Sequence, residues 1–358
     1  MVLLVGAGHA HLHLVAHADR LTDAGYQVHL LAPPEFRYSG VASASATGTL
    51  SGDAGVIDVA ALAARRRVRH HRGTLVGLDG PRALASNGGH IDWDVLALNV
   101  GSVAAEPQMD VGPDVVRIKP LDALAGLRDR LGGPPGSGTR RRVSIVGAGP
   151  SGLELAGHLS TRPDTEVHLV DQGSSPLAGL PPGAHAAVVD LLRGRGVRLR
   201  TGVPVAQVTS EGLKLRDGSE TAHDTAVLAT GLVAPAWLAD LGLSDPTRPH
   251  AGVPVRATLQ HRDRPAVYAT GDCADFLPQT LPALGVYGVR QGPVLLQSLL
   301  ARTAGRPLPE YTPQRRALQV LDLGGGTGLA VRGRQWWLGR SALWLKRRID
   351  ERWLSRYS

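Results

Sequence analysis

The sequence contains a single cysteine, Cys273, in 358 residues. One cysteine excludes a framework of structural disulfides and any dithiol redox centre formed within the chain. Aromatic residues are scarce at 4% of the sequence, and no uncharged apolar run has the roughly 20 residues that a membrane-spanning helix needs. No signal peptide is visible, because Met1 leads directly into an apolar stretch without a basic segment. These absences predict a cytoplasmic protein, or one held on the cytoplasmic face of a membrane.

Basic residues outnumber acidic ones, and the formal charge of +8 indicates an anionic partner such as a nucleotide, an acidic lipid or a nucleic acid. The most basic run, 65–72, carries no aromatic side chains between its charges, as nucleic-acid binding would need. We therefore predict a solvated face at the end of a helix over 57–64, and no nucleic-acid partner. The chain is long enough for two or three domains. The oligomeric state is not indicated.

Residues 142–171 have the pattern of a strand, a tight glycine turn, a helix and a second strand. Gly147 makes the turn, Gly149 lets a pyrophosphate approach the backbone, and Gly152 lets helix and strand pack closely. The phosphates then bind at the amide-rich start of the helix. Asp171 ends the second strand, where a carboxylate accepts hydrogen bonds from a ribose 2′-OH and repels a 2′-phosphate. The stretch predicts a dinucleotide site; the alternative is a glycine-rich turn in an unrelated α/β domain.

The N-terminus repeats this pattern in a weaker form, with a strand at 2–5, a turn at 6–11 and a helical stripe after it. Gly6 and Gly8 occupy the first two glycine positions. His11 replaces the third glycine, and Ala32 stands where the second strand would end in an acid. Glu35, three residues further on, is the candidate for the ribose contact.

Four histidines, at positions 9, 11, 13 and 17, follow this first glycine turn. His9, His13 and His17 share a helical face, which is one way to bind a metal ion. No carboxylate or cysteine completes a closed site, however. We favour histidines that donate to phosphate, and we predict no metal site.

Each glycine turn is followed in the sequence by a buried strand that ends in glycine. The strand at 94–101 ends at Gly101 and the strand at 226–231 ends at Gly231, so the two halves are internal copies that predict two nucleotide sites. A third buried strand ends in Gly271 and Asp272. A carboxylate beside a glycine at a strand end can accept from the sugar-alcohol hydroxyls of a flavin. N-capping of the next helix, at 284–301, is an alternative role and is compatible with the first.

Two glycine fingerprints, ATG at 229–231 and TGDCA at 270–274 resemble the two-dinucleotide-binding flavoproteins of the pyridine nucleotide-disulfide oxidoreductase superfamily. Within it the chain resembles type II NADH dehydrogenases, and more closely the flavoproteins fused to selenide, water dikinase. The marks of the closer resemblance are VGAGHAHLHLV at 5–15, RYSG at 37–40, LNVGS at 98–102, KP at 119–120, GVYGVRQGPVL at 285–295 and LKRRIDERWLSRY at 345–357.

The resemblance implies an α/β fold with two Rossmann-like dinucleotide-binding domains, the second inserted in the first, plus a small C-terminal region. The FAD-binding domain would comprise 1–117 and 235–305, and the NADH-binding domain 118–234 with a linker at 132–139. The C-terminal strands and amphipathic tail would occupy 306–358. FAD would be bound by Gly6, Gly8, His9, Ala10, Glu35, Gly101, Gly271, Asp272 and Val286. NADH would be bound by Gly147, Gly149, Gly152, Asp171 and Gly231.

The resemblance also implies an activity, in which hydride passes from NADH to the flavin and electrons pass on to an acceptor. Glu154 matches a glutamate implicated in proton delivery; the alternative is a charge favoured at a helix start. In type II NADH dehydrogenases two glutamines mark the quinone site. In this sequence their positions hold Val286 and Arg290, and only Gln291 remains as a glutamine in the segment. We take Glu154 and Gln291 as the catalytic candidates and a quinone as the first acceptor. The alternatives are a soluble reductase of a redox protein or of a selenium or sulfur compound, and a flavin-binding sensor with little turnover.

Four of the six tryptophans lie in the tail from Trp336 onward. If 342–357 is helical, Leu345, Ile349, Trp353 and Tyr357 fall on one face, with most of the basic residues off it. Such a helix suits the interface of an anionic membrane. The alternative is that the same stripe packs on the core of the protein.

Overall fold

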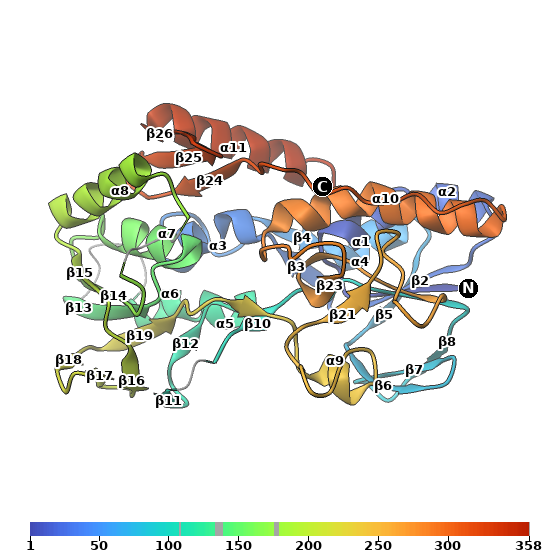
Figure 1. The fold of residues 1–358 in the computed structure, drawn as a ribbon, viewed down its shortest axis with the longest axis horizontal. Coiled ribbons are helices and arrows are strands. Elements are labelled where there is room, and N and C mark those ends of the chain that lie inside the picture. Colours follow the sequence, from blue (N-terminus) through green and yellow to red (C-terminus); the bar gives the residue numbers. More distant parts are fainter. Residues whose placement is uncertain (107–108, 133–138, 175–178, 358) are drawn as a thin grey trace.

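The protein has two α/β halves lying side by side and a C-terminal region across one edge of both (Figure 1). This computed structural model describes residues 1–106, 109–132, 139–174 and 179–357. Most of the linker predicted at 132–139 lies outside the described residues. The arrangement confirms the predicted fold class of two Rossmann-like units with a small C-terminal addition.

The first half is built on a parallel five-stranded sheet. Its strands, in spatial order, are β22 (Val267–Ala269), β9 (Val95–Leu98), β1 (Val2–Val5), β2 (Val28–Ala32) and β5 (Arg69–Arg72). Every residue of β1, β2, β9 and β22 is buried, which is typical of a parallel sheet covered on both faces. Helices α1 (His9–Ala16) and α10 (Gly285–Thr303) pack against each other beside it.

The register of this sheet brings three turns together at one edge. Val5 pairs with Leu98, and Leu98 pairs with Ala269, so β1, β9 and β22 end side by side. The residues that follow these strands include the two glycine motifs predicted to hold the flavin. In open α/β sheets this carboxyl edge is where ligands bind.

The second half repeats the plan. Its parallel sheet has the order β12 (Val116–Arg117), β19 (Thr225–Leu228), β13 (Arg141–Val146), β14 (Thr165–Asp171) and β15 (Arg198–Thr201). Val146 pairs with both Val170 and Leu228, so the second glycine turn, Asp171 and the strand end before Gly231 share one edge. Helices α7 (Pro150–Leu159) and α8 (Pro182–Gly194) belong to this half.

The chain passes from the first half to the second and back through two short antiparallel strands. These are β10 (Val103–Ala104) and β20 (Leu232–Val233). The second unit is therefore inserted in the first. Strand β12 already pairs in the second sheet, just before the boundary predicted at 118. The ranges 1–117, 118–234, 235–305 and 306–358 stay a prediction.

Residues 121–130 form two short helices, α5 (Leu121–Ala125) and α6 (Leu127–Arg130), which are separated at Gly126. One local prediction needs correction. The basic run predicted at a helix end continues as the edge strand β5, because it pairs with β2 after α4 (Val59–Arg65) has ended. His70 Nε2 is 2.9 Å from the carbonyl oxygen of Ala32 in that pairing. An edge strand carrying exposed arginines is protected from further strand pairing.

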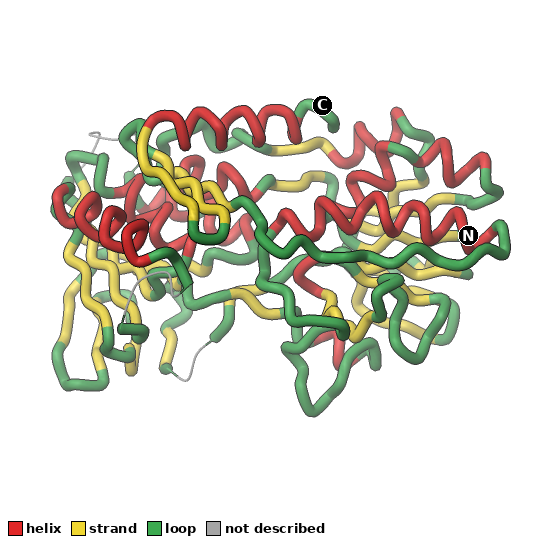
Figure 2. Tube along the Cα trace, turned by 45° about the horizontal axis from the view of Figure 1, so that its top comes forward, coloured by secondary structure: helices red, strands yellow, loops and turns green. Residues whose placement is uncertain are grey.

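The C-terminal region is a three-stranded meander followed by a long helix (Figure 2). The elements are β24 (Gln319–Asp322), β25 (Gly328–Arg332), β26 (Gln335–Gly339) and α11 (Arg340–Leu354). Apolar residues of β24 and β25 join the core of the second half, and Trp353 and Tyr357 join the core of the first. The region therefore holds the two halves together.

The predicted apolar stripe of the tail is split. Trp353 and Tyr357 are 6% and 4% exposed, whereas Ile349 is 42% exposed. The face turned to the protein runs instead through Leu343, Lys346 and Asp350. Its two charged members form an ion pair of 2.8 Å, which lets them be buried where apolar residues were expected.

Smaller elements complete the chain. Near the first half lie α2 (Ala18–Asp23), β3 (Glu35–Arg37), the 3-10 turn Ser39–Val41, α3 (Ala42–Ala46), β4 (Val56–Asp58), β6 (Leu75–Asp79), β7 (Arg82–Ala85) and β8 (His90–Asp92). Beyond them come β11 (Asp110–Val111), β16 (Val205–Val208), β17 (Gly212–Leu215), β18 (Glu220–Ala222), α9 (Trp237–Asp240), β21 (Val253–Val255), the 3-10 turn Gly271–Cys273 and β23 (Ala274–Phe276).

Candidate functional site

A single cleft with a volume of about 2190 Å³ is lined by both halves and by the C-terminal region. Twelve of the predicted site residues line it: Gly6, Gly8, His9, Glu35, Gly101, Gly147, Gly149, Glu154, Asp171, Gly231, Gly271 and Asp272. Ala10, Gly152, Val286 and Gln291 are not among its lining residues. The two glycine turns predicted from separate stretches of sequence therefore open into one space.

The first glycine turn is fixed by a residue that sequence reasoning missed. Asn99 Oδ1 accepts the backbone N–H groups of Ala10 at 3.0 Å and His11 at 3.3 Å, while its Nδ2 donates to Thr270 at 2.7 Å. One buried amide thus ties together the ends of β1, β9 and β22. A Cβ on Gly8 would overlap this side chain, so glycine is required there.

Other glycines leave room in the cleft itself. Gly101, Gly149 and Gly231 face open space, where an added Cβ would meet no described atom within 4 Å. All three line the cleft. A side chain at any of them would occupy the space against the backbone that a flat or phosphorylated ligand needs. The cradle therefore fits dinucleotide cofactors.

The second glycine turn is held by close packing and by Asp171. Gly147 has φ of +107°, and a Cβ on Gly152 would overlap the carbonyl oxygen of Gly147. Asp171 accepts from the backbone N–H of Ala148 at 2.5 Å and of Gly173 at 2.7 Å. These bonds orient the carboxylate at the cleft. Glycine thus serves the close packing that the fingerprint predicts.

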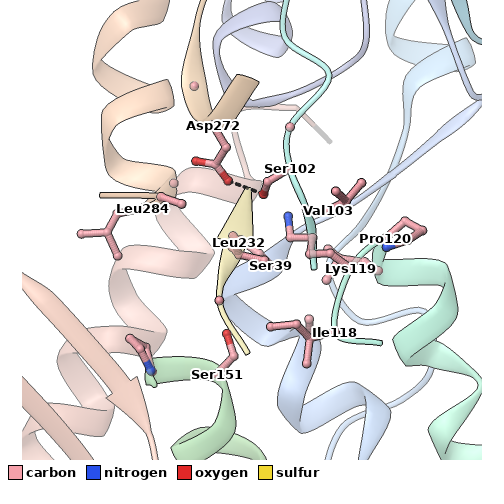
Figure 3. Close-up of a pocket in the computed structure, with 18 of the residues that line it drawn as sticks. Ser39, Ser102, Val103, Ile118, Lys119, Pro120, Ser151, Leu232, Asp272 and Leu284 are labelled. Carbon is pink, nitrogen blue, oxygen red and sulfur yellow. Dashed lines mark hydrogen bonds between the residues drawn. The ribbon is translucent and has the colours of Figure 1, made fainter. Parts of the chain in front are cut away.

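Asp272 lies on the opposite side of the cleft, where it accepts the Ser102 hydroxyl at 2.7 Å (Figure 3). Gln291, on α10, is not among the residues that line the cleft and is 1% exposed. Its Oε1 accepts the Gly271 N–H at 2.6 Å. Gln291 is thus a positioning residue for the loop that carries Asp272. Ser102 belongs to the LNVGS motif, but its role could not be assigned from sequence.

Of the four histidines at the first turn, His9 is the one that lines the cleft, and its contact with a phosphate stays a prediction. His11 is completely buried, with Nδ1 2.7 Å from the carbonyl oxygen of Gly6. Burial lowers the pKa of His11 to about 4. His9 lines the cleft, and burial together with the charge of Lys119 lowers its pKa to about 3. Both rings are therefore neutral, and His11 spans the place of the third glycine by binding backbone.

Glu154 occupies the second turn of α7, facing the cleft, and has partners from three elements. Its Oε2 accepts the Ser43 hydroxyl at 3.3 Å, and its Oε1 accepts the Asp322 N–H at 2.9 Å. Burial raises the pKa of Glu154 to about 7, although the ammonium of Lys346 acts against that rise. A carboxyl group with this pKa can hold or release a proton near neutral pH.

Cys273 contributes no redox chemistry. Its thiol is buried beneath the turn after β22, where burial raises its pKa to about 11. A reactive cysteine needs an accessible thiolate near neutral pH. Any redox function must therefore depend on bound cofactors.

Residues 1–292 match the pyridine nucleotide-disulphide oxidoreductase family, and the chain belongs to that family. A "nitric oxide reductase FlRd-NAD(+) reductase" of Aeromonas salmonicida is 30% identical over 248 residues, covering 67% of this chain and 59% of that protein. An "NADH dehydrogenase-like protein" of Mycobacterium tuberculosis is 30% identical over 218 residues, 56% of this chain and 53% of that protein. A ferredoxin reductase from Rhodopseudomonas palustris has the same fold, with a TM-score of 0.73 at 23% identity over 96% of this chain and 92% of that one.

The family match places the chain among the pyridine-nucleotide oxidoreductases, and the cleft fits the FAD and NAD(H) that such enzymes use. The alignments span just over half the length of the curated relatives. The narrower resemblance to flavoproteins fused to selenide, water dikinase stays a prediction. Among the described residues, none of the helices combines the length and the apolar character needed to cross a bilayer.

Proposed function

We propose that the protein passes electrons from NADH through FAD to a small redox protein. The observation that carries this proposal is the opening of both glycine turns into one cleft. Two dinucleotides bound there can meet at their reactive ends without leaving the protein. Bound FAD would supply the two-electron chemistry, taking a hydride from NADH and passing electrons onward.

Each wall of the cleft has a role in this proposal. Gly6 and Gly8 leave room for the FAD pyrophosphate, and Asp272 accepts from its sugar-alcohol chain. Asp171 binds the ribose 2′-OH of NADH. Glu154 holds a proton close to the meeting point of the two cofactors, since its pKa of about 7 keeps it half-protonated near neutral pH.

The acceptor proposed from sequence was a quinone, and we now favour the alternative of a redox protein. The name of the Aeromonas salmonicida relative gives a redox protein, FlRd, and NAD(+) as the partners of that reductase. The one remaining glutamine of the quinone pattern is Gln291. Its side-chain oxygen accepts the Gly271 N–H, and it is not among the residues that line the cleft. The chemistry expected of a quinone site is therefore missing from the described lining.

Anaerobic addition of NADH to the FAD-loaded protein, followed by reoxidation with candidate acceptors, tests the proposal. The flavin absorbance should bleach within seconds, and a rubredoxin-like or ferredoxin-like protein should restore it faster than a water-soluble quinone does. Faster reoxidation by the quinone would reverse the choice of acceptor. Flavin that NADH does not bleach would favour the sensor with little turnover.

A membrane-bound quinone reductase is the second candidate, because α11 exposes an apolar and basic outer face. Trp344 is 63% and Ile349 42% exposed, and the Arg348 guanidinium lies 5.9 Å from the centre of the Trp344 ring. Indoles beside cations suit the headgroup region of an anionic bilayer. Flotation with phosphatidylglycerol vesicles should then be lost in Trp344→Ser. Protein that stays in the soluble fraction with such vesicles would remove this candidate.

A further inference from the structure

A lysine in the cleft has no partner that accounts for its charge. Lys119 follows β12, and its side chain enters the cleft on the side where Ser102 and Asp272 lie (Figure 3). The structure gives its amine no hydrogen bond and no ion pair with any described residue. By contrast, Lys346 in the same cleft pairs with Asp350 at 2.8 Å.

The segment that carries Lys119 is fastened on both sides. The Ile118 N–H donates to Leu228 at 3.1 Å, which continues the pairing of β12 with β19. Asp122, at the start of α5, forms an ion pair of 2.8 Å with Arg37 of β3. The lysine is therefore presented from a fixed backbone, and its direction into the cleft is not a property of a loose loop.

The surroundings of Lys119 suit a flat ring better than a phosphate. Ile118, Val103 and Leu232 flank it with apolar groups (Figure 3). Burial lowers the pKa of Lys119, and the carboxylate of Asp272 acts against that change by attracting the ammonium. The other titratable group that senses Lys119 is His9, which is neutral.

Hydride transfer creates a charge on the flavin ring. NADH + FAD gives NAD⁺ + FADH⁻, because the hydride delivers two electrons and one proton to the ring. The oxidised ring is neutral and the product is an anion, so a nearby cation binds the reduced cofactor more tightly than the oxidised one. An interaction with that difference drives the transfer forward.

We propose that Lys119 is the counter-charge of the reduced flavin and sets its potential. The proposal rests on the function proposed above and deepens it. An opposite charge within about 4–6 Å shifts a pKa by roughly one to three units. Removing the charge should therefore raise the pKa of the reduced flavin by that amount. The reduced flavin would then be a tenfold to thousandfold weaker acid.

The test compares Lys119→Gln and Lys119→Arg with the wild type, all loaded with FAD. The midpoint potential of the bound flavin is measured between pH 6 and 9 by enzymatic reduction against a reference dye, followed by absorbance. Lys214→Gln is the matched control, because Lys214 is exposed on β17 and far from the cleft. At the alkaline end, Lys119→Gln should lower the midpoint potential by about 30 mV for each tenfold change in equilibrium of a two-electron couple. Lys119→Arg and Lys214→Gln should stay at the wild-type value.

Two results would overturn the proposal. A Lys119→Gln potential equal to that of Lys214→Gln across the pH range would show that the amine does not sense the reduced ring. Loss of oxidised FAD from Lys119→Gln, with retention in Lys119→Arg, would assign the lysine to holding the cofactor. Failure of NADH to reduce the wild type would refute the proposed function alone, because the dye titration needs no NADH.

Discussion

Trp353 should be the residue that docks the C-terminal helix on the first half, and its removal tests that docking. The indole is 6% exposed and stacks on Tyr38 with ring centres 4.5 Å apart at 18°. It also lies 4.8 Å from both His9 and Tyr357. Trp353→Ala would remove these contacts and leave a cavity between α11 and the turn that carries His9.

The expected cost is large. Burial of about 200 Å² of aromatic surface at ~25 cal/mol per Å² stabilises the fold by about 5 kcal/mol. Measured losses for buried tryptophan to alanine are about 3–5 kcal/mol. Trp344 provides the control, since it is 63% exposed and its Arg348 contact is worth about 0.5–1 kcal/mol at most.

Urea denaturation followed by circular dichroism measures both free energies of unfolding, and release of FAD fluorescence reports on the cleft. Trp353→Ala should unfold at clearly lower urea and release FAD earlier, because His9 and Tyr38 lose the ring that covers them. The free energy of unfolding of Trp344→Ala should stay within about 0.5 kcal/mol of the wild-type value, apart from the loss of its cation contact. Equal transitions for the two variants would refute the docking of α11.

Four further changes have defined outcomes. Asn99→Ala should cost about 1–3 kcal/mol for each buried group left unpaired and should lower FAD content in the purified protein. Asp272→Ala should lose most FAD on gel filtration; full retention would contradict its role. Asp171→Ser should narrow the preference for NADH over NADPH in steady-state rates, since two charges near 4 Å at a dielectric of about 20 interact by ~4 kcal/mol. Glu154 is protonated below about pH 7 and ionised above it, so a turnover rate that uses its proton should fall as pH rises through 7. The pH profile of Glu154→Gln should lack this fall.

The glycine turns could be predicted because their signal is local. Gly147, Gly152 and Asp171 lie within one strand, turn and strand, and each requirement acts on a near neighbour. The same holds for Gly6 and Gly8. Both turns, both sheets and their common carboxyl edges follow from such short stretches, and the structure confirms the fold class that they imply.

The sequence does not predict the interactions between residues that lie far apart in the chain. Asn99 binds Ala10 and Thr270, which are 89 and 171 positions away from it. Lys119 comes near Asp272 only because the two halves of the fold lie against each other. The tail left two interpretations open because an amphipathic helix has the same pattern on a membrane and on a core. From the sequence, Lys346 and Asp350 in this helix are expected to face solvent, whereas the structure buries both.

The C-terminal region completes the cleft, and this has a consequence for the acceptor. The family match ends at residue 292, while Asp322 and Lys346 come from beyond it and act on Glu154. The glycine turns and Asp272 lie inside the matched part. The parts of the cleft that we propose bind NADH and FAD therefore lie within the family match. The groups around Glu154 depend in part on strands and a helix that lie outside it. We expect acceptor specificity to follow the C-terminal region, because a family that keeps its cofactor chemistry can change its electron acceptor only at a surface that is free to vary.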